Sequence, residues 1–244
     1  MNFNKADARE IAENLCLNDD ELLLVDSFLV ICEFLEEFPN EISWRTSKRN
    51  PKKPTVDNKT DLERLAQKYF EGYRRSDLPT EPATIPDEMV SVIMEGVYGY
   101  TSEQCDRIKI EHQYSMCAEN CVGNLLERYI NSVLIGNNWY WCCGEFIKAI
   151  DFLGKDENGE WVALQIKNRD NSENSSSSAI RAGTRIQKWF RSFSKDTKKG
   201  RDSFTNWDNL PKLMRGYNLN EKSFKDFTRG YISNGKQLTN ENKR

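Results

Sequence analysis

Three polar residues on a predicted β-hairpin, Asp151, Gln165 and Lys167, have the types and spacing needed for phosphodiester chemistry. Glu157-Asn158-Gly159 reads as a three-residue turn closed by glycine, which predicts that residue 156 pairs with 160 and residue 151 with 165. Successive side chains of a strand point to opposite faces, so Lys167 shares the face of Gln165. We therefore expect a carboxylate, an amide oxygen and an ammonium group to converge on one side of a small sheet.

This set of groups suits a divalent metal ion and an attacking water molecule. A hard cation prefers oxygen ligands, which Asp151, the Gln165 amide and the backbone carbonyl of Ile166 offer. Phosphodiester hydrolysis also needs a cation or base beside the nucleophile, and Lys167 is placed for that task. The alternative is an ordinary salt bridge between Asp151 and Lys167. Because Asp151 interrupts the apolar stretch 147–153, where a carboxylate is costly, the functional interpretation is favoured.

Several elements must position these residues. Alternating or apolar runs predict strands over 139–143, 146–153 and 161–169, and heptad-like apolar spacing predicts a helix over 115–135 that ends at Gly136. A polar loop, 170–178, leads into a predicted helix over 178–193. The first hundred residues predict four helices, over 7–17, 19–38, 60–74 and 87–97, the third capped by Thr60 or Asp61. The fold class is thus α/β, a small mixed sheet flanked by helices, with an N-terminal helical region.

The charge of the chain is divided along its length. Residues 161–244 contain 18 Lys and Arg against 8 Asp and Glu, whereas residues 1–160 contain 17 against 30. A basic third on an acidic protein indicates a polyanion-binding face, since phosphate contacts need clustered cations. A merely uneven surface is the alternative.

The segment after the hairpin supplies candidate DNA contacts. Three cations at helical spacing and a nearby hydroxyl form a row suited to phosphates: Arg181, Arg185 and Lys188, with Thr184. Arg191 is expected near the same surface. Residues of the polar loop have hydrogen-bonding groups suited to base edges: Arg169, Asn171, Ser172 and Asn174. A serine-rich linker followed by a basic solvated helix remains the alternative.

The pattern Asp-x13-Gln-x-Lys on a hairpin, with a helix before and after it, resembles the core of the PD-(D/E)XK nucleases. The resemblance implies that Asp151 binds Mg²⁺ and that Lys167 orients or deprotonates the attacking water. Two positions depart from the pattern: Ile150 replaces proline, and Gln165 replaces the second acidic residue, which removes a negative charge from the site.

Family members often supply a glutamate from the preceding helix in a Gly-x3-Glu pattern, and Gly123-Asn-Leu-Leu-Glu127 matches it. Glu127 is therefore our candidate second carboxylate and metal ligand, with Glu119 and Glu145 in reserve. A solvated Glu127 paired with Arg128 or Asn131 is the alternative.

The stretch 165–193 is more narrowly similar to the SinI-type restriction endonucleases, which cleave GG(A/T)CC. This implies a type II restriction endonuclease that requires Mg²⁺, cuts double-stranded DNA and acts as a homodimer on palindromes. The order of the predicted elements and the charge along the chain predict three regions: an N-terminal helical region (1–100), a nuclease catalytic core (101–195) and a basic C-terminal extension packed on the core (196–244). A structure-specific repair or recombination nuclease and a non-catalytic DNA-binding protein with a decayed site remain alternatives.

Other function classes find little support in the sequence. A zinc site could be built from Cys105, His112, Cys117 and Cys121, but their spacing favours buried helix cysteines. The chain has 7 cysteines, an odd number without regular spacing, which favours a reducing cytoplasm. No apolar run is long enough for a membrane span, and no glycine-rich phosphate loop suggests a nucleotide cofactor.

Overall fold

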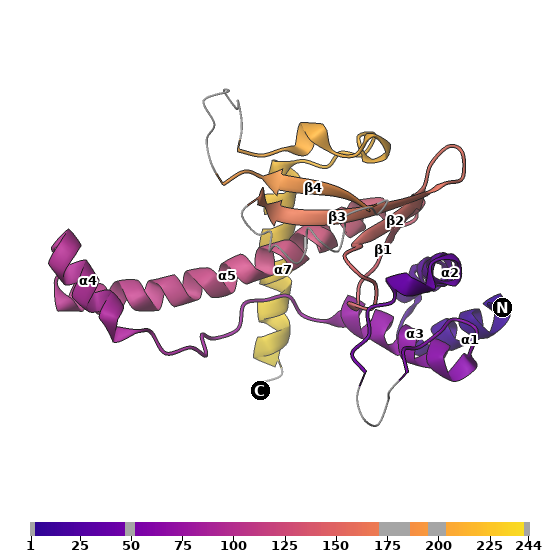
Figure 1. Cartoon of the computed structure of the whole chain (residues 1–244), viewed down its shortest axis with the longest axis horizontal. Coiled ribbons are helices and arrows are strands. Elements are labelled where there is room, and N and C mark those ends of the chain that lie inside the picture. The colour runs from indigo at the N-terminus through magenta and orange to yellow at the C-terminus, as the bar shows by residue number, and fades with distance from the viewer. Residues whose placement is uncertain (1–2, 47–51, 171–185, 195–203, 242–244) are drawn as a thin grey trace. The chain divides into compact units, whose positions relative to one another are not determined.

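The computed structural model describes residues 3–46, 52–170, 186–194 and 204–241 (Figure 1). The chain divides into two compact units, Met1–Arg75 with Glu127–Phe227, and Ser76–Leu126 with Thr228–Arg244. Among the described residues, no helix is both long enough and apolar enough to cross a membrane.

Three helices of the first unit come from the N-terminal region: α1 (Lys5–Leu15), α2 (Leu22–Glu37) and α3 (Lys59–Arg74). Short 3-10 turns precede and follow α2, at Asp19–Glu21 and Pro39–Glu41. The predicted helices over 7–17, 19–38 and 60–74 are confirmed in type. The predicted cap of α3 is wrong, because Asn58 accepts the hydrogen bond from the backbone amide of Asp61.

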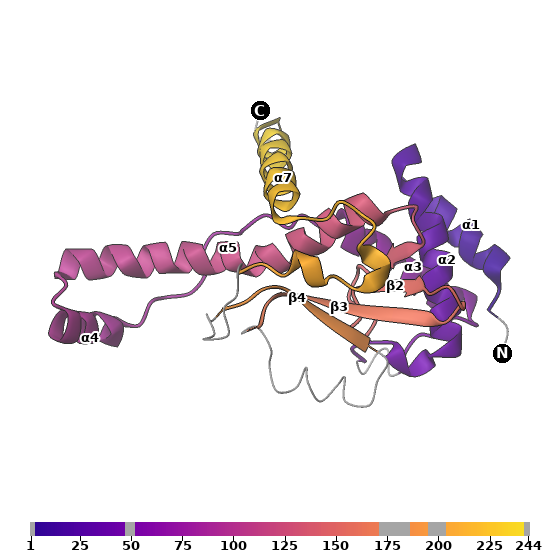
Figure 2. The same ribbon diagram turned by 90° about the horizontal axis from the view of Figure 1, so that it is seen from above.

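This unit also contains a four-stranded mixed sheet, in the order β1-β2-β3-β4. Its strands are β1 (Trp139–Trp141), β2 (Phe152–Lys155), β3 (Trp161–Arg169) and β4 (Ile186–Ser192). Strand β2 is antiparallel to both β1 and β3, whereas β4 is parallel to β3, and β3 and β4 lie side by side in both views (Figure 1 and Figure 2). The predicted α/β class with a small mixed sheet is confirmed.

The hairpin between β2 and β3 has the predicted turn. Gly159 has a φ of 81°, and the amide of Asp156 donates to the carbonyl of Glu160 at 3.0 Å. Phe152 pairs with Leu164 and Lys155 with Trp161, so the register inferred from the turn holds across the paired residues.

The predicted strand over 146–153 is wrong for most of its length, because β2 begins only at Phe152. Glu145 and Ala149 have positive φ values of 59° and 51°, which regular strands do not adopt. Tertiary contacts override the apolar pattern here. The amide of Lys148 donates to Glu41 O and the carbonyl of Phe146 accepts from Ser43 N, both at 2.8 Å.

The predicted helix over 178–193 is wrong for residues 186–192, which form β4, and its remainder lies outside the described residues. Polar residues at three- and four-residue spacing suggested a helix, but Ile186, Trp189 and Phe190 are typical of a strand. Pairing with β3 leaves Trp189 only 3% exposed, so burial in the sheet decides the conformation.

The second unit contains α4 (Glu88–Tyr98) and most of α5 (Ser102–Leu134), whose last residues belong to the first unit. The predicted helix over 87–97 is confirmed, and the one over 115–135 begins much earlier, at Ser102. Helix α7 (Glu221–Glu241) was not predicted, and it begins in the first unit and ends in the second.

Candidate active site

Asp151 lies one residue before β2, where the regular pairing with β3 ends. Its backbone amide donates to Leu164 O at 2.8 Å, and its Oδ2 accepts a hydrogen bond of 2.6 Å from the amide of Ile166. Its own carbonyl accepts from Cys142 N at 2.8 Å in the ladder with β1. Asp151 is therefore fixed between β1 and β3, and its carboxylate reaches β3 beside Gln165, as the hairpin register predicted.

The environment of Asp151 opposes ionisation. Burial raises the pKa of this carboxyl to about 6, although the hydrogen bond from Ile166 and the positive charge of Lys167 both act to lower it. Lys167 is thus close enough to stabilise the Asp151 anion. Within the described part of the chain, Oδ2 is the only oxygen of this carboxylate that accepts a hydrogen bond.

Gln165 and Lys167 lie on β3 next to β4. Gln165 is only 5% exposed, and Lys167 is half-buried. In the parallel pairing, Gln165 is level with Lys188 and Lys167 with Phe190, while the Lys188 ammonium lies 4.6 Å from the centre of the Phe190 ring. Residues paired in register share a face, so a second lysine joins the side of the sheet that carries Gln165 and Lys167.

Glu127 approaches the sheet from the last turns of α5. Its Oε2 accepts a hydrogen bond of 2.9 Å from the indole nitrogen of Trp141, the β1 residue that pairs with Phe152. The guanidinium of Arg128 lies over the Trp141 ring, 5.2 Å from its centre. Glu127 is therefore held by Trp141, not simply solvated on the helix surface.

The charges of Glu127 and Asp151 both influence one buried thiol, that of Cys142. Burial, Cys143 and both carboxylates raise the pKa of Cys142 well above its usual value. Both negative charges therefore act on the residue that directly follows β1. The two reserve glutamates do not share this position: Glu145 pairs with Arg75 at 2.7 Å, and Glu119 is an exposed residue of the other unit.

The N-terminal helices hold the segment that leads to Asp151. Gly144 has a φ of 95° and packs against α3 so closely that a Cβ on Gly72 would lie well under 3.0 Å from its backbone nitrogen. Sγ of Cys143 donates to Tyr69 O at 3.4 Å in the same contact. We did not predict this role for the first hundred residues. The one signal in the sequence was Gly144 itself, between two predicted strands, because glycine beside a strand often marks a close backbone approach.

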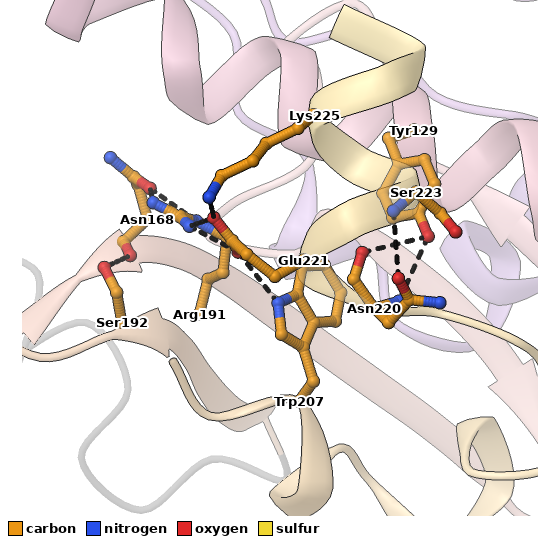
Figure 3. A network of polar contacts seen from close by, with 9 residues as sticks. All are labelled: Tyr129, Asn168, Arg191, Ser192, Trp207, Asn220, Glu221, Ser223 and Lys225. Carbon is orange, nitrogen blue, oxygen red and sulfur yellow. Dashed lines mark hydrogen bonds and ion pairs between the residues drawn. The ribbon is translucent and has the colours of Figure 1, made fainter. Parts of the chain in front are cut away.

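A polar network follows Lys167 at the end of β3 (Figure 3). Arg191 of β4 donates to both carboxylate oxygens of Glu221, at 2.7 and 2.9 Å, and to Oδ1 of Asn168, at 2.8 and 2.9 Å. The indole of Trp207 donates to Glu221 at 2.9 Å. The Arg191 side chain is 13% exposed and has internal partners, so it joins β3, β4 and α7, and its expected contact with phosphate stays a prediction.

The other predicted residues divide between described and undescribed parts of the chain. Arg169 ends β3 and is half-buried, and the neighbouring Asp170 accepts from Ser194 N at 2.6 Å. The remaining predicted DNA contacts lie outside the described residues and stay predictions: Asn171, Ser172, Asn174, Arg181, Thr184 and Arg185.

The cysteines considered for zinc make ordinary helix contacts. Sγ of Cys105 donates to Ser91 O at 3.9 Å, and Sγ of Cys121 donates to Cys117 O at 3.2 Å. In the described parts of the chain, no three His, Cys, Asp or Glu side chains gather as a metal cluster.

Comparisons with known proteins identify the class of protein to which this site belongs. A family model described as SinI restriction endonuclease matches residues 8–234, a range that includes every candidate residue above. The chain belongs to the SinI restriction endonuclease family.

Two relatives agree with this assignment. The type II restriction enzyme Eco47I of Escherichia coli is 45% identical over 210 residues, which cover 86% of this chain and 87% of the relative. The type II restriction enzyme SinI of Salmonella infantis is 44% identical over 210 residues, with the same coverage. The expected type II restriction endonuclease, a site-specific deoxyribonuclease, is confirmed at the level of this family.

Proposed function

We propose that this member of the SinI family hydrolyses both strands of double-stranded DNA with Mg²⁺, at the sequence GG(A/T)CC. The observation that supports this most strongly is the carboxylate of Asp151, which is partly buried and fixed against β3 between Gln165 and Lys167. A carboxylate that is costly to ionise is tolerated where a cation compensates it.

The donor set fits Mg²⁺ better than a softer metal. Asp151, the Gln165 amide and the Ile166 carbonyl are oxygen ligands, and the Glu127 carboxylate adds the negative charge that Gln165 does not supply. Mg²⁺ is commonly bound through one or two carboxylates, with water and substrate phosphates as its other ligands, so no larger acidic cluster is needed. When bound, the ion neutralises the scissile phosphate and lowers the pKa of water.

The chain's own residues have distinct tasks in this proposal. Asp151 anchors the ion, and its hydrogen bond to Ile166 fixes the carboxylate before the ion arrives. Lys167, two residues after Gln165 on β3, orients or deprotonates the attacking water. Trp141 holds Glu127 in place, so its indole nitrogen acts as a positioning group.

DNA recognition is assigned to the segment that follows β3. Arg169, Asn171, Ser172 and Asn174 contact base edges, whereas Arg181, Thr184, Arg185 and Lys188 contact phosphates. Lys188 does so from a strand and not from a helix. The proposal includes a homodimer on a palindromic site and a place in the cytoplasm.

The test is to incubate the purified protein with phage DNA and Mg²⁺ and to sequence the cut ends, with Asp151→Asn as the inactive control. Ends that all derive from GG(A/T)CC are the expected result. Ends at branched or mismatched DNA, or DNA binding with no cleavage in any divalent cation, would contradict the proposal.

A further inference from the structure

Helix α4 is apolar on nearly all sides but almost uncovered within its unit. Five of its aliphatic residues are between 44% and 69% exposed, namely Met89, Val90, Val92, Ile93 and Val97. Ser91 is its one buried residue. An apolar helix of 11 residues is marginal when surrounded by water, since isolated short helices need a packed face to be stable.

The neighbouring part of α5 continues this apolar surface. Ile110, Tyr114 and Met116 are each just over half exposed. Figure 1 shows α4 beside the N-terminal end of α5, and the two are joined by the Cys105–Ser91 contact and by the ion pair of Lys109 with Glu88 at 3.3 Å. We call α4 together with residues 102–116 the helical hairpin.

The charge of the helical hairpin indicates what could cover it. Residues 87–116 contain six acidic side chains against two basic ones: Asp87, Glu88, Glu95, Glu103, Asp106 and Glu111 against Arg107 and Lys109. DNA is therefore an unsuitable occupant, because phosphate contacts need cations. The basic residues are neutralised within the hairpin, since Arg107 pairs with Glu111 at 2.7 Å and Lys109 with Glu88 and Asp106. An apolar protein surface is the partner that this chemistry fits.

We propose that the helical hairpin is the surface through which two copies of this chain associate. The inference rests on the proposed function in one respect: each chain has one Asp151–Gln165–Lys167 set, so cutting both strands of a duplex at one site calls for two copies. A two-fold axis brings the same patch of each copy together, and such an interface must be self-complementary. The exposed aliphatic and aromatic side chains meet that condition, because apolar contacts do not need groups of opposite charge on the two copies.

The size of the surface is sufficient for a stable dimer. The eight exposed apolar residues named above are each about half exposed, and a large side chain has on the order of 200 Å² of surface. The exposed apolar side chains of the helical hairpin thus total on the order of 800 Å² per copy, the same order as the ~800 Å² that each partner of a specific interface typically buries. In such a dimer, α4 would contact α5 of its own chain on one side and the helical hairpin of the second copy on the other.

The experiment measures the mass of the full chain by sedimentation in the absence of DNA and Mg²⁺, over a range of concentrations. The test variant is Val92→Glu with Ile93→Glu, and the matched control is Leu17→Glu, because Leu17 is 75% exposed but lies in the other unit. All three substituted residues are solvent-exposed, and glutamate favours helix more than valine does, so the fold should survive. Circular dichroism checks this.

We expect the parent and the Leu17→Glu variant to be dimers, and the double variant to be a monomer with a dimer Kd at least about 100-fold higher. On supercoiled plasmid, the monomeric variant should nick one strand and rarely linearise. A parent that stays monomeric would overturn the proposal and mean that the chain itself covers the helical hairpin. A double variant that stays dimeric would overturn it equally. Dimers that do not cut DNA would contradict the proposed function and leave this interface standing.

Discussion

Oδ2 of Asp151 accepts a hydrogen bond of 2.6 Å from the backbone amide of Ile166, so a side chain takes the place of a backbone acceptor where β2 and β3 separate. The carboxylate is thereby fixed against the strand that carries Gln165 and Lys167 without any metal ion. Because the same position is largely shielded from water, the pKa of Asp151 is raised to about 6. The hydrogen bond therefore preorganises the carboxylate, whereas the burial of the same group makes its ionised form costly to the folded state.

The first prediction concerns this cost. The pKa of Asp151 in the folded, metal-free protein lies above the ~3.9 of an unfolded chain, so the folded state binds the proton more tightly. The contribution of Asp151 to the free energy of unfolding therefore falls as pH rises from about 4 to about 6, and is constant above that. Asp151→Asn keeps an acceptor for Ile166 and removes the charge. We expect it to be more stable than the parent by about 3 kcal/mol at pH 8, with little gain at pH 4.

Urea unfolding of both proteins without metal, at several pH values, measures this difference. The same variant should have no detectable cleavage at saturating Mg²⁺. More than a few per cent of parental activity would show that Asp151 is not the metal anchor, whatever its effect on stability.

The second prediction concerns Lys167. If its ammonium orients or deprotonates water, Lys167→Ala should slow single-turnover cleavage by about 10²-fold or more, and DNA binding measured in Ca²⁺ should change little. Lys188→Ala is the matched control from the paired strand, and it should weaken binding more than it slows the chemical step. If Lys167→Ala mainly weakened DNA binding and Lys188→Ala mainly slowed the chemical step, Lys167 would not be the residue that activates water.

The third prediction concerns the second negative charge. Glu127→Gln keeps a group that can accept from Trp141 but removes the charge, so we expect loss of Mg²⁺ affinity and a severe loss of cleavage. Gln165→Glu should be tolerated with Mg²⁺ present. In its absence this variant should be less stable than the parent, because it adds a carboxylate at a position only 5% exposed.

Thermal unfolding with and without Mg²⁺, together with cleavage rates as a function of Mg²⁺ concentration, distinguishes these effects. A fully active Glu127→Gln variant beside an inactive Gln165→Glu variant would reverse the two assignments.

The fourth prediction concerns the contact between α3 and the segment before Asp151. A methyl group on Gly72 would overlap the backbone of Gly144, which no side-chain rotation can relieve. We expect Gly72→Ala to lower the free energy of unfolding by about 1–3 kcal/mol and also to reduce kcat, because the segment that leads to Asp151 must move. The control is Gly230→Ala, since a Cβ there meets no atom within 4 Å and alanine favours the helix. If Gly72→Ala and Gly230→Ala changed the free energy of unfolding and kcat equally, α3 would not be the element that positions Asp151.

The sequence predicted those features of the site that depend on local chemistry. Gly159 and its turn determined the hairpin register, and the register placed Asp151 beside Gln165 before any coordinates were considered. The predicted bounds of β3 agree with the structure, and those of the N-terminal helices differ from it by one to three residues, because their periodicity is strong.

Features that depend on distant segments were not predictable in this way. Residues 144–151 have the composition of a strand, but their conformation is determined by backbone hydrogen bonds to residues 41–43 and by close packing against α3. Arg191 lies at a spacing typical of a phosphate-binding helix, but it is a strand residue bonded to Glu221, 30 positions later. Neither partner could be inferred from the local pattern, because both contacts form only when the sheet is assembled.

The parallel pairing of β4 affects how this protein is produced in a cell. The strands β1, β2 and β3 follow one another and can form a meander from a nascent chain that ends at Arg169. Strand β4 is synthesised later and must close a longer loop before it pairs, which makes its docking a late step. Until then the edge of β3 is open, and an open edge can pair with other chains. Slow expression at low temperature should therefore increase the soluble yield, and fragments that end before Ile186 should aggregate.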